Sequence, residues 1–186
     1  WATGNRAIAI GSIRPTEGNL KYPTGVGKDV TTGLQGTDYN TQAIANQAIA
    51  VGSGARTEAQ NSITMGTNAK VDATAEGYTF QKTNNAGVKE TLKLSTADRP
   101  IYGLDKKTVY ESGNGIAIGR ASHVTGKTTN AIAIGDAAVA GDGAVDATVI
   151  GSSANSKGVS SVAIGTTANV QGGEGSVAVG AGATVT

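Results

Sequence analysis

One stretch of the sequence comes close to a nucleotide-binding loop in its residue types and spacing. Residues 121–128 read Ala-Ser-His-Val-Thr-Gly-Lys-Thr, so Ala121 stands where the phosphate-binding pattern has its first Gly. Such a loop holds phosphates at the N-terminus of the helix that follows, and its chemistry therefore requires a helix directly after Thr128. The next residues, 130–134, alternate small and aliphatic side chains as a β-strand does. The sequence therefore argues against nucleotide binding.

Two further groups have residue types that could bind a metal ion or act in catalysis. Residues 172–175 read Gly-Gly-Glu-Gly, like the start of a calcium-binding nonapeptide repeat, but Val177 occupies the position that requires Asp. Gly141–Gly143 and Asp146 are interpreted as turn residues. His123 is the only His and the chain has 0 Cys, so a His cluster, a thiolate site or a Ser-His-Asp triad has too few members. We predict no catalytic residues, no metal and no cofactor, and place His123 in a turn.

The composition excludes further classes of partner. The 186 residues include 28 Gly but only 4% aromatic and 16% charged residues, with a formal net charge of +1. Phosphate-backbone binding needs a basic stripe, so we expect no nucleic-acid partner. No apolar run approaches the roughly 20 residues of a membrane helix, so we expect no direct membrane insertion of this segment. With few aromatics to fill it, the core must be thin.

One phrase of small, aliphatic, small, aliphatic and Gly residues recurs along the chain, most plainly at residues 160–168. Its Gly residues return at nearly constant intervals, 66 − 52 = 14, 135 − 119 = 16 and 180 − 165 = 15. Alternation with period two predicts a strand, the Gly turns the chain, and a second short strand follows. Coils of about 14 residues that stack at about 4.8 Å would pair these strands in parallel. The sequence predicts an all-β solenoid.

We assign the large aliphatic side chains to the interior of the stack, where burying each one stabilises by roughly 1.5–3 kcal/mol. On this assignment Ile134→Asp would place an unpaired charge in the core. The small residues of the opposite strand face would let other copies approach closely, which favours a symmetric homo-oligomer. The predicted repeat core consists of Ile8, Ile10, Ile49, Val51, Ile63, Met65, Ile116, Ile118, Ile132, Ile134, Ile150, Val162, Ile164, Val177 and Val179.

Two insertions, at about 14–40 and 72–113, interrupt what we otherwise treat as a single domain over residues 1–186. Residues 78–82 and 88–94 alternate around Asn-Asn-Ala-Gly, which predicts a β-hairpin. All Tyr residues and the single Phe lie in the insertions, and exposed aromatics are common ligand anchors. Alternatively, they form a small core for the second insertion. The aromatic candidates for ligand binding are Tyr78, Phe80, Tyr102 and Tyr110.

The repeated phrase resembles the YadA-like heads of trimeric autotransporter adhesins from Gram-negative bacteria. The matching stretches cover residues 61–69, 114–122, 130–138, 160–168 and 175–183. The resemblance implies a left-handed parallel β-roll, a homotrimer around a hydrophobic axis, and display at the bacterial cell surface on an outer-membrane anchored fibre. Thr148 and Val149 depart from the pattern because the polar and aliphatic residues have exchanged slots.

The resemblance also implies a function. YadA-like heads attach, without enzymatic activity, to host extracellular matrix proteins such as collagen, fibronectin or laminin, or to other cells. In some members the repeat motif itself takes part, which here implicates Asn130 and Ser160 as candidate ligand-binding residues. One alternative is a structural spacer whose fibre binds its ligand elsewhere. An ice-binding solenoid would need Thr at one fixed slot, whereas the Thr residues here occupy different slots.

Overall fold

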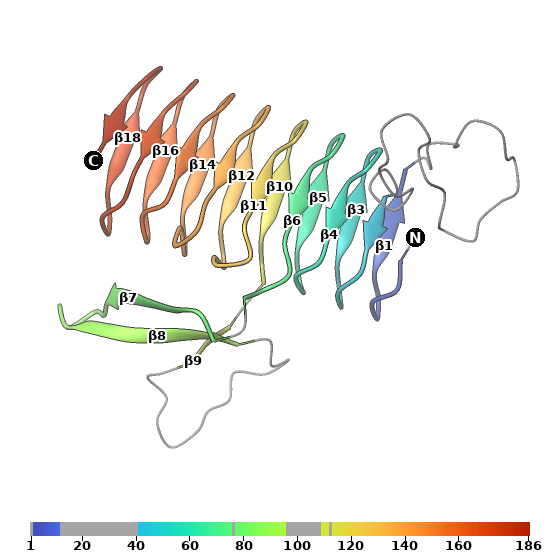
Figure 1. Ribbon diagram of the computed structural model, residues 1–186, viewed down its shortest axis with the longest axis horizontal. Helices are drawn as coiled ribbons and strands as arrows, with labels where there is room; N and C mark the ends of the chain where they lie inside the picture. Colours follow the sequence, from blue (N-terminus) through green and yellow to red (C-terminus); the bar gives the residue numbers. More distant parts are fainter. Residues whose placement is uncertain (1, 12–40, 76, 96–108, 112) are drawn as a thin grey trace, which may run out of the picture.

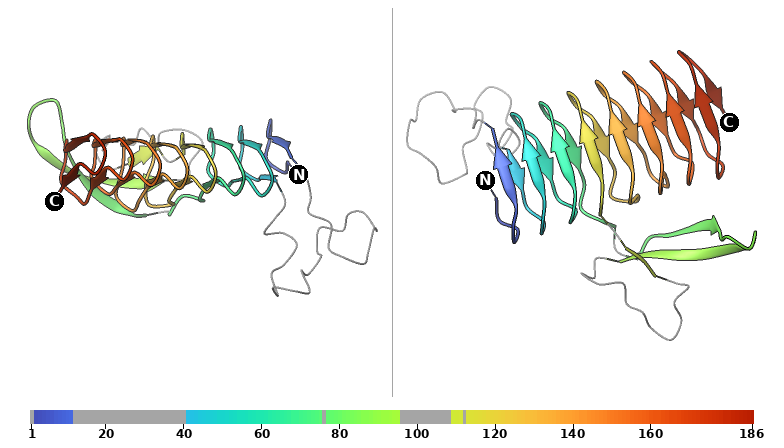
Figure 2. Two further views of the ribbon diagram at one scale, coloured as in Figure 1. Left: turned by 90° about the horizontal axis from the view of Figure 1, so that it is seen from above. Right: turned by 180° about the vertical axis from the view of Figure 1, so that it is seen from behind.

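The computed structural model describes residues 2–11, 41–75, 77–95, 109–111 and 113–186 (Figure 1). These residues form nineteen strands and no helix. Two parallel sheets of eight strands each are the opposite walls of a stack of coils, and a separate three-stranded sheet lies beside the stack (Figures 1 and 2). Each coil contributes a three-residue strand to the first sheet and a two-residue strand to the second. The predicted all-β parallel solenoid is confirmed.

The strands of each large sheet follow one another in chain order. The first sheet contains β1 (Ile8–Ile10), β3 (Ile49–Val51), β5 (Ile63–Met65), β10 (Ile116–Ile118), β12 (Ile132–Ile134), β14 (Thr148–Ile150), β16 (Val162–Ile164) and β18 (Val177–Val179). The second contains β2 (Gln42–Ala43), β4 (Arg56–Thr57), β6 (Lys70–Val71), β11 (His123–Val124), β13 (Val139–Ala140), β15 (Asn155–Ser156), β17 (Asn169–Val170) and β19 (Thr184–Val185). Equivalent residues pair from coil to coil, as Ile116 does with Ile132.

The interior of the stack is filled by small side chains, with the larger aliphatics outside. Ala133 of β12 and Ala140 of β13 are both 0% exposed, whereas Ile132 and Ile134 lie on the outer face of the first sheet. The prediction that the large aliphatics form the repeat core is therefore wrong. The residues concerned, none of them buried, are Ile8, Ile10, Ile49, Val51, Ile63, Met65, Ile116, Ile118, Ile132, Ile134, Ile150, Val162, Ile164, Val177 and Val179.

The closeness of the two sheets explains this reversal. A Cβ placed on Gly115, on the inner side next to β10, would lie 2.9 Å from Cγ1 of Val71 and 3.3 Å from Cγ1 of Val124, both on the opposite sheet. A Val that faces inward from the second sheet, as Val71 and Val124 do, therefore leaves little room for the side chains of the first sheet. A branched side chain at an Ala position would overpack a coil that already holds an inward Val. Val149 fits at this position because the second strand of its coil turns the smaller Ser156 inward. The small residues consequently do not form a surface through which other copies could approach.

The second insertion forms the three-stranded sheet. Strands β7 (Thr79–Thr83) and β8 (Lys89–Ser95) are antiparallel, as predicted, and β9 (Val109–Glu111) pairs in parallel with β8. In the hairpin turn, the Asn84 side-chain oxygen accepts hydrogen bonds from the backbone N–H of Ala86 (2.9 Å) and Val88 (3.0 Å). The hairpin runs alongside the coils towards the C-terminal end of the stack (Figure 1). The first predicted insertion, 14–40, lies outside the described residues.

Candidate binding surfaces

The outer face of the first sheet is apolar at every outward strand position except Thr148, and we call it the aliphatic face. Each of the eight strands turns its first and third residues outward, because side chains alternate along a strand. Exposure is greatest at the ends of the stack, reaching 60% for Ile10 and 63% for Val179. Contiguous apolar surfaces of this kind mark sites of association in soluble proteins. The aliphatic face is therefore the first candidate binding surface.

Strand β14 places a polar residue on the aliphatic face. Its first residue, Thr148, lies outside, and Val149 is completely buried at the position where the neighbouring strands place Ala133 and Ala163. The structure therefore confirms that the polar and aliphatic residues of this strand have exchanged positions relative to the other repeats. This exchange replaces one outward aliphatic side chain by a hydroxyl-bearing one.

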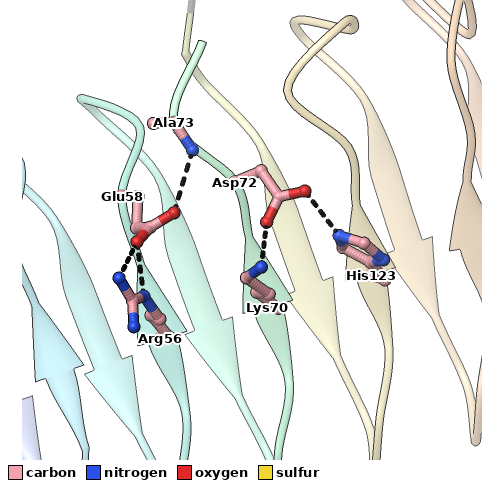
Figure 3. Close-up of polar contacts among 6 residues, drawn as sticks. All are labelled: Arg56, Glu58, Lys70, Asp72, Ala73 and His123. Atoms are coloured by element: carbon pink, nitrogen blue, oxygen red, sulfur yellow. Dashed lines mark hydrogen bonds and ion pairs between the residues drawn. The ribbon is translucent and has the colours of Figure 1, made fainter. Parts of the chain in front are cut away.

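The outer face of the second sheet is polar, and its first coils carry a cluster of charges. The polar cluster consists of Arg56, Glu58, Lys70, Asp72 and His123 (Figure 3). Arg56 pairs with Glu58, Lys70 Nζ lies 2.6 Å from one Asp72 oxygen, and His123 Nε2 lies 2.9 Å from the other. Further along the same face the outward residues are Val139, Asn155, Asn169 and Thr184. The charged residues within the strands of this face, Arg56 and Lys70, thus lie in the coils that precede the second insertion.

Asp72 is the residue that joins the polar cluster together. Its burial raises the pKa, but the contacts with His123 and Lys70 outweigh this effect and lower the pKa of Asp72 to about 2. His123 lies in strand β11, so the prediction that it is a turn residue is wrong. Among the described residues, no group of three His, Cys, Asp or Glu side chains is arranged to hold a metal ion. The mutual pairing makes this cluster an attachment of one coil to the next.

The aromatic candidates of the hairpin differ in accessibility. Phe80 is only 6% exposed and packs with Leu94 of β8 and Val145 of the coils. Tyr78 is half-buried beside them, with the ammonium of Lys127 5.9 Å from its ring centre. These side chains form a core that the hairpin shares with the stack, which favours the alternative interpretation over ligand anchoring for Phe80. Tyr110 lies in β9, and Tyr102 lies outside the described residues.

Polar contacts fasten the tip of the hairpin to the coils. Lys82 Nζ lies 2.5 Å from an Asp146 carboxylate oxygen. The backbone N–H and hydroxyl of Thr83 donate hydrogen bonds of 2.5 and 2.6 Å to the two oxygens of Glu174, and these bonds lower the pKa of Glu174. Sequence reasoning interpreted Asp146 as a turn residue and missed both pairings, because the paired residues are 64 and 91 positions apart in the chain and no local pattern connects them.

Asn130 and Ser160, the candidates from the repeat motif, occupy equivalent turns before strands β12 and β16. Both have a left-handed backbone with φ of 52°, a conformation that Asn adopts readily. The Asn130 side chain accepts a hydrogen bond from the Asn114 amide and donates one to Asp146, each of 2.9 Å. Because Asp146 also pairs with Lys82, Asn130 belongs to a line of polar contacts that reaches the hairpin. Ser160 lies one coil beyond Asp146, and its N–H donates to the Val145 carbonyl at 2.7 Å.

A comparison with protein-family models relates the chain to a known repeat family. The model described as the YadA head domain repeat (two copies) matches residues 1–12, 43–69, 112–138 and 143–168, and thus stops at both sides of each insertion. In a comparison with curated proteins, no sequence matches the chain. Among the described residues, no helix is long and apolar enough to cross a membrane.

Proposed function

We propose that this chain, which is a YadA-like head by its repeats and its parallel solenoid fold, is a ligand-binding head of a bacterial surface adhesin, assembled as a homotrimer. YadA head domains belong to surface-exposed autotransporter adhesins, a family that is not enzymatic. The observation that carries the assembly is the aliphatic face, which runs the whole length of the described stack. Copies that pack through this face remove it from water.

The distribution of polar and apolar side chains supports this mode of packing over the alternatives within the fold. The outer face of the second sheet carries the ion pairs of the polar cluster, and burying these charges against another copy would cost free energy. Each outward Ile or Val that becomes fully buried stabilises the assembly by up to roughly 1.5–3 kcal/mol, less the part that neighbouring coils already cover. The aliphatic face is therefore the side on which copies of the chain associate.

The first experiment tests assembly with a matched pair of variants in one coil. Ile134 lies on the aliphatic face, and Val139 lies on the outer face of the opposite sheet. We expect the wild type to sediment as a trimer at micromolar concentration, Ile134→Asp to sediment as a monomer with an unchanged β-sheet circular dichroism spectrum, and Val139→Asp to remain a trimer. A folded wild type that sediments as a monomer would contradict the proposal.

For ligand binding we propose host extracellular matrix proteins such as collagen, fibronectin or laminin, or the surfaces of other cells. The surfaces left open when copies associate through the aliphatic face are the polar outer sheet, the turns of the coils and the second insertion. Many weak contacts, repeated on three chains and on many fibres, give strong attachment through avidity. Whether attachment occurs at this head distinguishes the proposal from the alternative of a structural spacer.

The second experiment locates the ligand contacts. Immobilised collagen, fibronectin and laminin, and host cells, are tested for retention of the intact chain and of a variant in which a Gly-Ser linker replaces residues 77–111. We expect the intact chain to be retained on at least one surface. Loss of retention in the variant assigns the contacts to the insertion, and equal retention assigns them to the coils. A folded trimer that none of these surfaces retains would instead support the spacer function.

A further inference from the structure

We propose that Thr148 is a positioning residue that fixes the axial register in which copies of the chain assemble, an inference that rests on the homotrimer proposed above. The eight strands of the first sheet present two outward residues each, and Thr148 is the only polar one among those sixteen described positions. Its neighbours on the same face are Ile132 and Val162, which pair with it in the adjacent strands. The Thr148 hydroxyl makes no hydrogen bond within the described part of the chain.

The packing of the coil does not force this arrangement. Thr64 lies in the interior of its own coil at 0% exposure, with its hydroxyl oxygen 2.6 Å from that of Thr57, so the interior can take a Thr when a hydroxyl partner is present. Val162 and Val177 show that Val is suited to the outer position. In β14 the order is reversed, and the polar residue faces outward. Because packing within the chain does not require Thr148 to face outward, we attribute its position to contacts that the aliphatic face makes with other copies of the chain.

A repetitive apolar face specifies the alignment of its partners poorly. Coils recur at about 4.8 Å. A copy displaced by one coil would therefore restore aliphatic contacts at every level except the ends of the stack. A single polar residue within an apolar interface removes such ambiguity, as a buried Asn does in coiled coils. Thr148 occupies that position on the aliphatic face.

The hydroxyl distinguishes aligned from displaced copies by its hydrogen bonds. In the aligned assembly the Thr148 side chains of different copies lie at the same level, where each hydroxyl can donate to one neighbour and accept from another. In an assembly displaced by one coil, Thr148 faces Ile132 or Val162 of the next copy, and its hydroxyl is left unpaired against apolar atoms. An unpaired buried hydroxyl disfavours the displaced assembly by about tenfold or more.

The chain has 0 Cys, so single cysteines can report the register directly. One chain carries Ile116→Cys and a second, tagged chain carries Ile132→Cys; these positions face outward on adjacent coils. The two chains are refolded together and oxidised, and disulfide-linked pairs are separated by size. Disulfide formation requires Cα atoms about 4.4–6.8 Å apart, so the aligned assembly joins like with like and a one-coil displacement joins 116 to 132.

With Thr148 present we expect like-with-like pairs to dominate, and with Thr148→Val we expect the mixed 116–132 pair to increase about tenfold. Moving the hydroxyl to the next coil, in the double variant Thr148→Val with Val162→Thr, should restore like-with-like pairs. A mixed fraction unaffected by Thr148→Val would overturn the register inference and leave the homotrimer standing. Cysteine-bearing chains that form no pairs while they retain Thr148, together with a wild-type chain that sediments as a monomer, would overturn the homotrimer itself.

Discussion

At the scale of single residues, backbone geometry explains why Gly and Asn recur at fixed positions of the repeat. A Cβ on Gly135 would lie 2.4 Å from the carbonyl oxygen of Gly151 in the next coil, and Gly135 has a φ of 136°, so a larger residue would collide and be strained. Asn130 holds the left-handed turn that leads into the strand. The phrase therefore recurs because each coil repeats the same two turns. Its recurrence identifies the scaffold and does not by itself mark a ligand site.

Asp72 gives the protein a pH-dependent contribution to stability. Because its pKa is lowered from 3.8 to about 2 in the folded chain, the contribution is complete above about pH 4 and is lost as the pH falls towards 2. Allowing for solvent screening of a partly exposed group, it amounts to about 1 kcal/mol. We expect Asp72→Asn to lower the melting temperature by roughly 2–4 °C at pH 6 and to have little effect below about pH 2. A difference independent of pH would contradict the role of the charge.

At the scale of elements, the hairpin illustrates what local sequence can and cannot predict. Its strands and turn were predictable because alternation and the turn residues 84–87 are local signals. Its position against the coils was not, since the contacts of Phe80 with Val145 and of Thr83 with Glu174 join residues distant in the chain. Nothing in the residue types of Val145 and Glu174 predicts that they contact the hairpin. The contacts between the hairpin and the coils therefore appear only in the three-dimensional structure.

Removing the ring of Phe80 should release the hairpin without unfolding the stack. Truncating a buried Phe to Ala costs about 3–5 kcal/mol in a core, and here that core joins the hairpin to the coils. We expect Phe80→Ala to abolish hydrogen-exchange protection of the β7 and β8 amides and to leave that of β12 and β14 unchanged. Gln81→Ala, at an exposed position on the same strand, is the control and should change neither. Equal loss of protection in β12 would show that the hairpin and coils unfold together.

The assignment of strand faces failed for a reason that lies in the dimensions of the coil. Period two establishes that Ile132 and Ile134 share a face opposite to Ala133, but it does not say which face is inside. In a thick core the larger residues would be inside, whereas the narrow space between these two sheets buries Ala, Ser, Thr and Val but, among the described residues, no Ile. The useful signal was Ala138, which follows the turn and is buried like Ala133, so both walls of one coil carry Ala inward.

At the scale of the whole molecule, the regular spacing was sufficient to predict the parallel stack, because identical coils can bury their inner faces only against each other. The same regular spacing does not predict which residues lie on the outer surface. The outer row of the second sheet changes from Arg56, Lys70 and His123 to Val139, Asn155 and Asn169 without altering a single strand pairing. Fold and outer surface thus vary independently, so the repeat predicts the first and leaves the ligand to experiment.

The pairing across the second insertion has a consequence for how such heads diversify. Strand β5 pairs with β10 and β6 with β11 in the same register that adjacent coils use, although some fifty residues separate them (116 − 63 = 53). The register of the coils is thus the same with the insertion as without it, although the inserted hairpin also packs on coils further along through Val145, Asp146 and Glu174. A different appendage could therefore be carried at this joint without any change in the strand pairing of the coils, provided that its surface matched the coils on which it lies.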